Sequence, residues 1–176
     1  MRAVDSLNFR LATQDDVTAL VTLVESAYRG DSSRVGWTTE ADLLDGQRTD
    51  PHSMSGIIAK PGSVIVLAER DGELLACANV ERLEHAAYFG MFSVRPGLQG
   101  GGIGNALIAE CERIARADWE LKKMRMTVIW TRTELIAWYQ RRGYRATGEC
   151  KEFPYGDPKF GVPKREDLHF EIYEKD

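Results

Sequence analysis

Four glycines lie at the point where a predicted strand passes into a predicted helix. Within residues 96–120, which read PGLQGGGIGNALIAECERIARADWE, Gly100, Gly101, Gly102 and Gly104 precede apolar residues at helical spacing. The start of a helix directs unpaired N–H groups outward at the positive end of its dipole, and this arrangement favours phosphate oxygens. Glycine lets a phosphate approach the backbone because no Cβ stands in the way. The segment predicts a phosphate-binding loop, with a tight turn that binds nothing as the alternative.

The residues beside these glycines narrow the class of phosphate ligand. A P-loop ends in G-K-[ST], whereas the chain here reads Gly104-Asn105-Ala106. No register of the dinucleotide fingerprint G-x-G-x-x-G fits, because its third glycine would fall on Asn105 or on Leu107. The sequence therefore disfavours an ATP or GTP site and also an NAD or FAD site.

The spacing that does fit is Q-x-x-G-x-G, at Gln99 to Gly104. It resembles the acyl-CoA motif of the GNAT superfamily of N-acetyltransferases, which follows the fourth strand of that fold and holds the CoA pyrophosphate. Residues 128–149, VIWTRTELIAWYQRRGYRATGE, resemble the family's second motif, with a strand, a short helix that bears a tyrosine, and a final Gly-Tyr. The resemblance covers the chain from about residue 8 to residue 174.

The resemblance implies that acetyl-CoA is the co-substrate. It also implies that the strand ending near Arg95 parts from the next strand of the sheet and leaves backbone N–H groups for the pantetheine arm. Arg141 is a candidate for the phosphates, although a cation in a last helical turn is already explained by the helix dipole. The residues expected to bind the cofactor are Phe92, Val94, Gln99, Gly100, Gly101, Gly102, Ile103, Gly104, Asn105 and Arg141. The second motif departs from the family at Arg132, Leu135 and Trp138, where Asn, Ala and Leu are common.

Acetyl transfer to an amine requires a neutral amine and a stabilised leaving sulfur. An alkyl amine with a pKa of about 10.4 is neutral to roughly 4 parts in 10,000 at pH 7, a cost of about 4.6 kcal/mol, so a base or a water wire is needed. Glu81 is the first candidate, because the family often places its carboxylate on these central strands. Glu84, Glu40 and Asp42 are alternatives, as is a solvated charge without a role. By the same resemblance Tyr139 would protonate or hydrogen-bond the thiolate, unless it only packs in the core.

The acceptor amine is not specified by any motif. We expect a small molecule, and the acidic balance of the chain favours a cationic one. A protein N-terminus or lysine is an alternative acceptor, and an acyl-CoA sensor or interaction module without turnover is an alternative class. Phe153, Tyr155 and Phe160 lie in a long loop, where they are candidates for substrate recognition or a dimer contact. The resemblance also implies a homodimer.

The elements before the glycines are predicted from spacing and turn residues. A helix begins at Thr13, where Thr13 and Asp16 form a capping-box pattern, and a shorter helix runs from residue 38 or 39 to residue 46. Asp71-Gly72 predicts a hairpin turn between two antiparallel strands within residues 63–83.

Strands and helices alternate in the second half of the chain. The pattern predicts a strand, a helix, a strand, a helix and two further strands over residues 86–96, 103–115, 122–130, 131–142, 144–149 and 168–174. The expected fold class is α/β, with a GNAT-like mixed, mostly antiparallel central sheet flanked by helices. Residues 1–176 are expected to form a single acetyltransferase domain.

Composition excludes several classes of protein. The 176 residues are 43% hydrophobic and 28% charged, which is typical of a globular chain, and the formal net charge of −4 opposes binding to nucleic acid. The sequence has neither a run of about 18 apolar residues nor a signal-peptide pattern, so we expect a cytoplasmic protein that does not bind membranes. His52, His85 and His169 lack metal-ligand spacing, and no metal site is expected.

Overall fold

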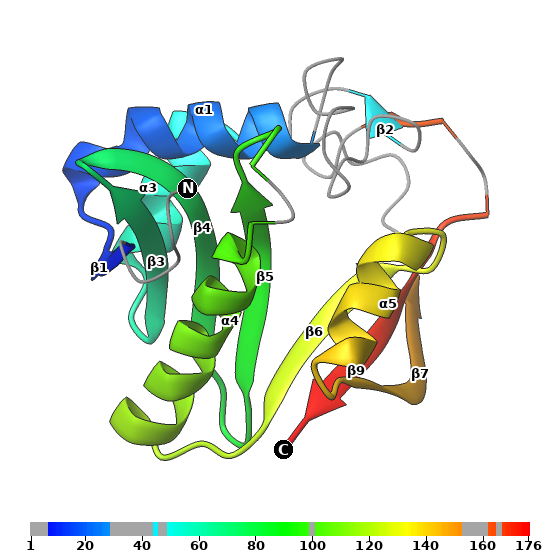
Figure 1. Ribbon diagram of the computed structural model, residues 1–176. Helices are drawn as coiled ribbons and strands as arrows, with labels where there is room; N and C mark the ends of the chain where they lie inside the picture. The colour runs from blue at the N-terminus through cyan, green and yellow to red at the C-terminus, as the bar shows by residue number, and fades with distance from the viewer. Residues whose placement is uncertain (1–6, 29–43, 46–48, 99–100, 153–161, 165–166) are drawn as a thin grey trace.

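A seven-stranded sheet forms the centre of the molecule (Figure 1). The structure is a computed structural model that describes residues 7–28, 44–45, 49–98, 101–152, 162–164 and 167–176. The strands lie in the order β1 (Asn8–Leu11), β3 (Ser63–Arg70), β4 (Glu73–Arg82), β5 (Ala87–Val94), β6 (Met124–Ile129), β9 (His169–Lys175) and β7 (Arg145–Glu152). Neighbouring strands are antiparallel except β5 and β6, which are parallel. The expected mixed, mostly antiparallel sheet is confirmed.

Helices pack against both faces of this sheet (Figure 1). On one face, α1 (Val17–Tyr28) and α3 (Pro51–Ala59) form a core with residues of β3 and β4 such as Leu67 and Cys77. On the other face, α4 (Ile103–Arg113) and α5 (Thr133–Arg141) form a larger core with Phe89 and its neighbours. None of the helices in the described ranges is long and apolar enough to cross a membrane.

The predicted hairpin and first helix are confirmed. Asp71 and Gly72 both have positive φ, 55° and 77°, which a tight two-residue hairpin turn requires. The Asp16 carboxylate accepts the Thr13 N–H at 2.8 Å, so the capping box forms. A single 3-10 turn, Gln14–Asp16, leads from this cap into α1.

The helix predicted from residue 38 or 39 to residue 46 is wrong at its end. Leu44–Asp45 form the short strand β2, which pairs with β8 (Val162–Pro163), and the remainder of that prediction lies outside the described residues. Helix α3 was not predicted, although the signal was present. The Asp50 carboxylate accepts the Ser53 N–H at 2.8 Å as an N-cap, and Pro51 suits the first helical position. Strand β1 was missed because four residues are too few to show alternation.

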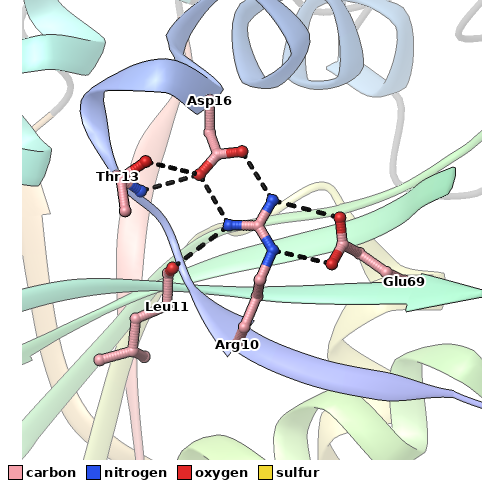
Figure 2. Close-up of polar contacts among 5 residues, drawn as sticks. All are labelled: Arg10, Leu11, Thr13, Asp16 and Glu69. Atoms are coloured by element: carbon pink, nitrogen blue, oxygen red, sulfur yellow. Dashed lines mark hydrogen bonds and ion pairs between the residues drawn. The ribbon is translucent and has the colours of Figure 1, made fainter. Parts of the chain in front are cut away.

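Arg10 connects the edge strand β1 with the start of the first helix (Figure 2). Its guanidinium donates to the Asp16 carboxylate at 2.7 and 2.9 Å and to the Glu69 carboxylate on β3 at 2.8 and 3.2 Å. Hydrogen bonds from Arg10 and then from Thr13 hold the pKa of Asp16 below its ordinary value, although burial opposes them. The network fixes where α1 begins over the sheet, and α1 contributes Tyr28 to the site described below.

Candidate active site

Strands β5 and β6 are paired at one end only. The register joins Ala87 with Met124 and Tyr88 with Arg125, and β5 continues from there to Val94 with no further β6 partner. Tyr88, which belongs to the last pair, also forms a hydrogen bond through its hydroxyl with the hydroxyl of Thr127 on β6, at 2.5 Å between the oxygens. The two strands then separate beside α4 and α5, as the family resemblance implies (Figure 1).

A β-bulge at Met91 explains why β5 leaves β6. On β4, Cys77 pairs with Ser93 and Asn79 pairs with Gly90, so β5 carries one residue more than β4 in this span. Met91 has a φ of 53°, in the left-handed region that its side chain disfavours. Bulges bend a strand and end regular pairing locally. This bulge lies in the part of β5 that has no β6 partner.

Helix α4 begins directly after the glycine run, so the predicted strand-to-helix junction is confirmed. Gly102 is the N-cap and has a φ of 83°, which glycine adopts without strain. Ala106 donates the first main-chain hydrogen bond of the helix, to the Gly102 carbonyl at 3.0 Å. The N–H groups of Ile103, Gly104 and Asn105 precede it and are not used by the helix. The first turn carries no acidic residue, and this helix start therefore suits an anion.

Gly104 also allows α4 to approach β5 closely. A Cβ at this position would lie 2.9 Å from Cζ of Phe92 and 3.4 Å from Cζ2 of Trp138. The Phe92 and Trp138 rings stack with their centroids 5.3 Å apart, and Phe92 is 2% exposed. The last glycine of the motif therefore has a packing role that spacing alone did not reveal.

Most residues expected to bind the cofactor lie close together in the chain and in the fold. Apart from Arg141 on α5, those that the structure describes extend from the end of β5 to the first turn of α4: Phe92, Val94, Gly101, Gly102, Ile103, Gly104 and Asn105. Gly101 and Asn105 are exposed. Gln99 and Gly100 lie outside the described residues.

Tyr139 lies on α5 with its ring buried among other aromatic rings. The ring centroids of Phe89, Phe92 and Tyr144 lie 6.2, 6.4 and 5.9 Å from its own. The hydroxyl of Tyr144 donates to the Glu112 carboxylate at 2.8 Å, which fixes one side of this cluster. Tyr139 is only 4% exposed, and among the described residues its hydroxyl has no hydrogen-bond partner.

The surroundings of Tyr139 keep its phenol protonated. Burial, and after it the nearby Tyr28, raise the pKa of Tyr139 well above its ordinary value, while the Arg132 cation opposes this in part. The Tyr28 hydroxyl donates to the Phe92 carbonyl on β5, and the Arg132 guanidinium carbon lies 5.4 Å from the Tyr28 ring centroid. Sequence reasoning did not assign Tyr28 or Arg132 to the site, because Tyr28 only continued the apolar face of a helix and Arg132 was only a departure from a motif.

Glu81 lies on the opposite face of the sheet from Tyr139. It alternates along β4 with Val80, which belongs to the α4 core, and so shares the face covered by α1 and α3. Its carboxylate accepts a hydrogen bond from Lys60 Nζ at 2.9 Å, and its side chain is 23% exposed. In the register it lies opposite Tyr88, at the end of β5 that is still paired with β6.

The two arginines at the end of α5 have different surroundings. Arg141 is exposed, and its side chain forms no hydrogen bond or ion pair with the described residues. Arg142 donates from Nε to the Asn105 side-chain oxygen at 3.0 Å and from Nη1 to the Trp138 carbonyl at 2.9 Å. Its guanidinium carbon lies 3.6 Å from the Trp138 ring centroid. The sequence predicted Arg141 as the candidate for the phosphates. The different surroundings of the two arginines depend on how α5 packs against α4, which the sequence alone does not show.

The profile of the Acetyltransferase (GNAT) family matches residues 19–144. This span runs from within α1 to Tyr144, just after α5. It includes the glycine motif, the second motif as far as its Gly-Tyr, and the diverging strands β5 and β6. The chain belongs to the GNAT acetyltransferase family and is therefore an acyltransferase. No curated protein sequence matches the chain.

Solved structures with the same fold include several acetyltransferases. A ribosomal-protein-alanine N-acetyltransferase from Brucella melitensis is 20% identical, with a TM-score of 0.69 over 96% of this chain and 98% of that one. A GNAT-family acetyltransferase from Streptococcus pneumoniae is 18% identical, with a TM-score of 0.65 over 96% and 98%. A spermidine/spermine N-acetyltransferase from Vibrio cholerae is 12% identical, with a TM-score of 0.68 over 97% and 92%. At these identities the likeness shows the fold.

Proposed function

We propose that this protein is a cytoplasmic N-acetyltransferase that moves the acetyl group of acetyl-CoA to an amine of a small molecule, with residues 1–176 as one acetyltransferase domain. The observation that carries the proposal is Tyr139, a buried residue beside the separation of β5 and β6 whose hydroxyl has no hydrogen-bond partner among the described residues. In the reaction the amine nitrogen attacks the thioester carbonyl carbon. A C–N bond forms and the C–S bond breaks. The nitrogen gives up a proton to the base, and the sulfur leaves as a thiolate that takes up a proton from solvent.

The residues around the start of α4 fit the acyl donor. A helix start without acidic residues, preceded by Gly102 in a left-handed conformation, suits the pyrophosphate of CoA. The part of β5 that has no β6 partner offers backbone to an extended chain with amide groups, such as the pantetheine arm. These features support Phe92, Val94 and the residues from Gln99 to Asn105 as the donor site.

Tyr139 is the proposed donor to the departing sulfur. Its raised pKa keeps the phenol protonated at neutral pH, so it can donate but cannot act as the base. The pKa of an ordinary thiol is about 8.5, below that of this phenol, so a hydrogen bond to the thiolate is favoured over complete proton transfer. Phenylalanine at this position is the corresponding test, given in the Discussion.

Glu81 is the proposed base for the amine. Glu81 lies on the α1 and α3 face of the sheet and Tyr139 lies on the other face, so in this proposal the base and the donor to the sulfur act from opposite faces. We expect Glu81→Gln to lower the amine-dependent rate at pH 7 by about 100-fold or more relative to the wild type. At pH 9 the rate of the variant should be reduced by a smaller factor, because more of the amine is already neutral. A pH–rate profile checks this. If the variant and the wild type had the same pH–rate profile, Glu81 would not be the base.

The acceptor class is tested by thiol release from acetyl-CoA in the presence of a panel of amines. The panel should contain polyamines, free amino acids, a peptide with an N-terminal alanine and a peptide with an internal lysine. We expect a small amine, and a cationic one in particular, to release thiol, because the net charge of −4 attracts cations. Release with the peptides alone would overturn the small-molecule assignment. Binding of acetyl-CoA without release by any amine would favour the sensor alternative.

The homodimer is also part of the proposal. Strand β7 lies at the edge of the sheet, and all eight of its residues are exposed. Such an edge presents unpaired backbone groups that a second copy can pair with.

A further inference from the structure

Arg142 holds a positive charge against the start of helix α4. Its Nε donates to the Asn105 side chain in the first turn of α4 at 3.0 Å, and its guanidinium lies over the Trp138 ring at 3.6 Å from the centroid. Trp138 itself lies near Gly104, at 3.4 Å from the position a Cβ would occupy there. The guanidinium, the indole and the helix start thus form one side-chain cluster, which we name the Arg142 cluster after its cation.

A cation at this position is electrostatically unfavourable without an anion. The N-terminal end of a helix carries a partial positive charge of its own. Burial and the neighbouring Arg141 cation lower the pKa of Arg142. Within the described residues no carboxylate pairs with it. The C-terminal end of α5 helps to tolerate a cation here, but it does not explain why the side chain reaches toward α4.

The acidic residues of α4 are paired elsewhere. Glu110 accepts hydrogen bonds from Arg113 at 2.7 and 2.8 Å, and Glu112 accepts from Lys175 at 3.0 Å and from Tyr144 at 2.8 Å. All these contacts lie in the second half of the helix. The first turn therefore combines unused backbone donors with a guanidinium, and it lacks a balancing negative charge from the acids of its own helix.

We propose that Arg142 binds the pyrophosphate of the acyl donor together with the N-terminal amides of α4, and that Arg141 does not. This inference rests on the proposed use of acetyl-CoA. The Arg142 guanidinium already makes two hydrogen bonds and stacks on the Trp138 indole, so its orientation is defined. Little side-chain entropy is therefore lost when it binds a phosphate. Asn105 acts as a positioning residue, because it orients Nε of Arg142 and leaves the outer guanidinium nitrogen Nη2 for the ligand.

Calorimetric titration of CoA, dephospho-CoA and pantetheine tests the proposal without requiring turnover. Dephospho-CoA keeps the pyrophosphate and lacks the 3′-phosphate, while pantetheine lacks both. We expect Arg142→Gln to weaken CoA and dephospho-CoA alike, by roughly 10- to 100-fold in Kd, and to leave pantetheine unchanged. Arg142→Lys should recover part of the loss, since it keeps the charge and loses the planar geometry. Arg116→Gln, which removes an exposed cation beyond the C-terminal end of α4, is the matched control and should bind as the wild type does.

Each other outcome contradicts a stated part of the proposal. A loss confined to CoA would place Arg142 on the 3′-phosphate, and a loss in Arg141→Gln without one in Arg142→Gln would assign the role to Arg141. Unchanged binding by Arg142→Gln, with tight binding by the wild type, would overturn the inference alone. No binding of CoA by the wild type would overturn the proposed function itself. A melting curve for each variant separates loss of binding from loss of folding.

Discussion

Tyr139→Phe should lower kcat by about 10- to 1,000-fold, while the Kd for acetyl-CoA stays nearly unchanged. The expected loss extends below the roughly 100- to 10,000-fold typical of general acid–base catalysis, because the hydroxyl hydrogen-bonds the thiolate without giving up its proton. The reason is that the hydroxyl is the only part removed, and its proposed partner is the sulfur that carries charge late in the reaction. The hydroxyl has no hydrogen-bond partner among the described residues, so its removal should not lower the free energy of unfolding. Steady-state kinetics and calorimetric titration measure the two effects.

Tyr173→Phe is the matched control for this variant. Tyr173 is also buried, at 3% exposed, but its hydroxyl donates to Glu171 at 3.1 Å on strand β9. This substitution should cost about 0.5–1.5 kcal/mol of stability and leave kcat unchanged. The two variants thus have opposite profiles, one losing rate and the other losing stability. If Tyr139→Phe and the wild type had equal kcat values, the Tyr139 hydroxyl would have no role in the reaction.

The raised pKa of Tyr139 sets the expected pH dependence of the same reaction. Because burial disfavours the phenolate, the hydroxyl remains a donor at every pH below about 10, and its ionisation should not reduce the rate there. The rate should instead rise with pH as the amine loses its proton. A fall in rate between pH 8 and 9 that disappears in Tyr139→Phe would contradict this assignment.

Gly104→Ala should lower the free energy of unfolding by about 1–3 kcal/mol, which is typical of overpacking a core. Alanine normally stabilises a helix interior by up to about 1 kcal/mol relative to glycine. Here the added Cβ would lie 2.9 Å from Cζ of Phe92. The Phe92 ring is buried and stacked on Trp138, so it cannot move away without disrupting that packing. The steric term therefore exceeds the helix propensity. Displacement of the start of α4 should also weaken CoA binding, which titration can measure.

Gly56→Ala provides the comparison within the same protein. Gly56 lies in helix α3, and a Cβ there would meet no atom within 4 Å. That variant should be as stable as the wild type or more stable by up to about 1 kcal/mol, and its affinity for CoA should not change. Denaturant unfolding of both variants separates propensity from packing. If Gly104→Ala matched Gly56→Ala in stability and kept its affinity for CoA, close approach of α4 to β5 would not be a constraint.

The strand-to-helix junction was predictable because its signal is local. Glycine conformational freedom and helical spacing both act within a few residues, and Gly102 is indeed the left-handed cap of α4. The Asp71-Gly72 turn was predictable for the same reason, since both residues must have positive φ. Helix α3 also carried a local signal at Asp50-Pro51, but it follows a segment in which hydroxyl and acidic residues suggested an earlier helix.

The rest of the site depends on contacts between distant segments. The bulge at Met91 cannot be recognised from the sequence. Its neighbours are mostly apolar, so one extra residue in the strand does not change the hydrophobic pattern. The choice between Arg141 and Arg142 depends on how α5 packs on α4, and Tyr28 reaches the site only because α1 ends over β5. Sequence spacing describes a single helix or strand, whereas the position of each of these side chains depends on how two such elements pack together.

Acetyl transfer to an amine, with Tyr139 acting on the sulfur, is tested most directly by the rate at which free thiol appears from acetyl-CoA. This rate should be measured with and without an amine, for the wild type and for Tyr139→Phe. We expect release that depends on the amine and is at least about 10-fold slower in the variant, although both proteins bind acetyl-CoA equally. Amine-dependent release at the same rate in both proteins would contradict the role of Tyr139, and no release with any amine despite tight binding of acetyl-CoA would contradict acetyl transfer.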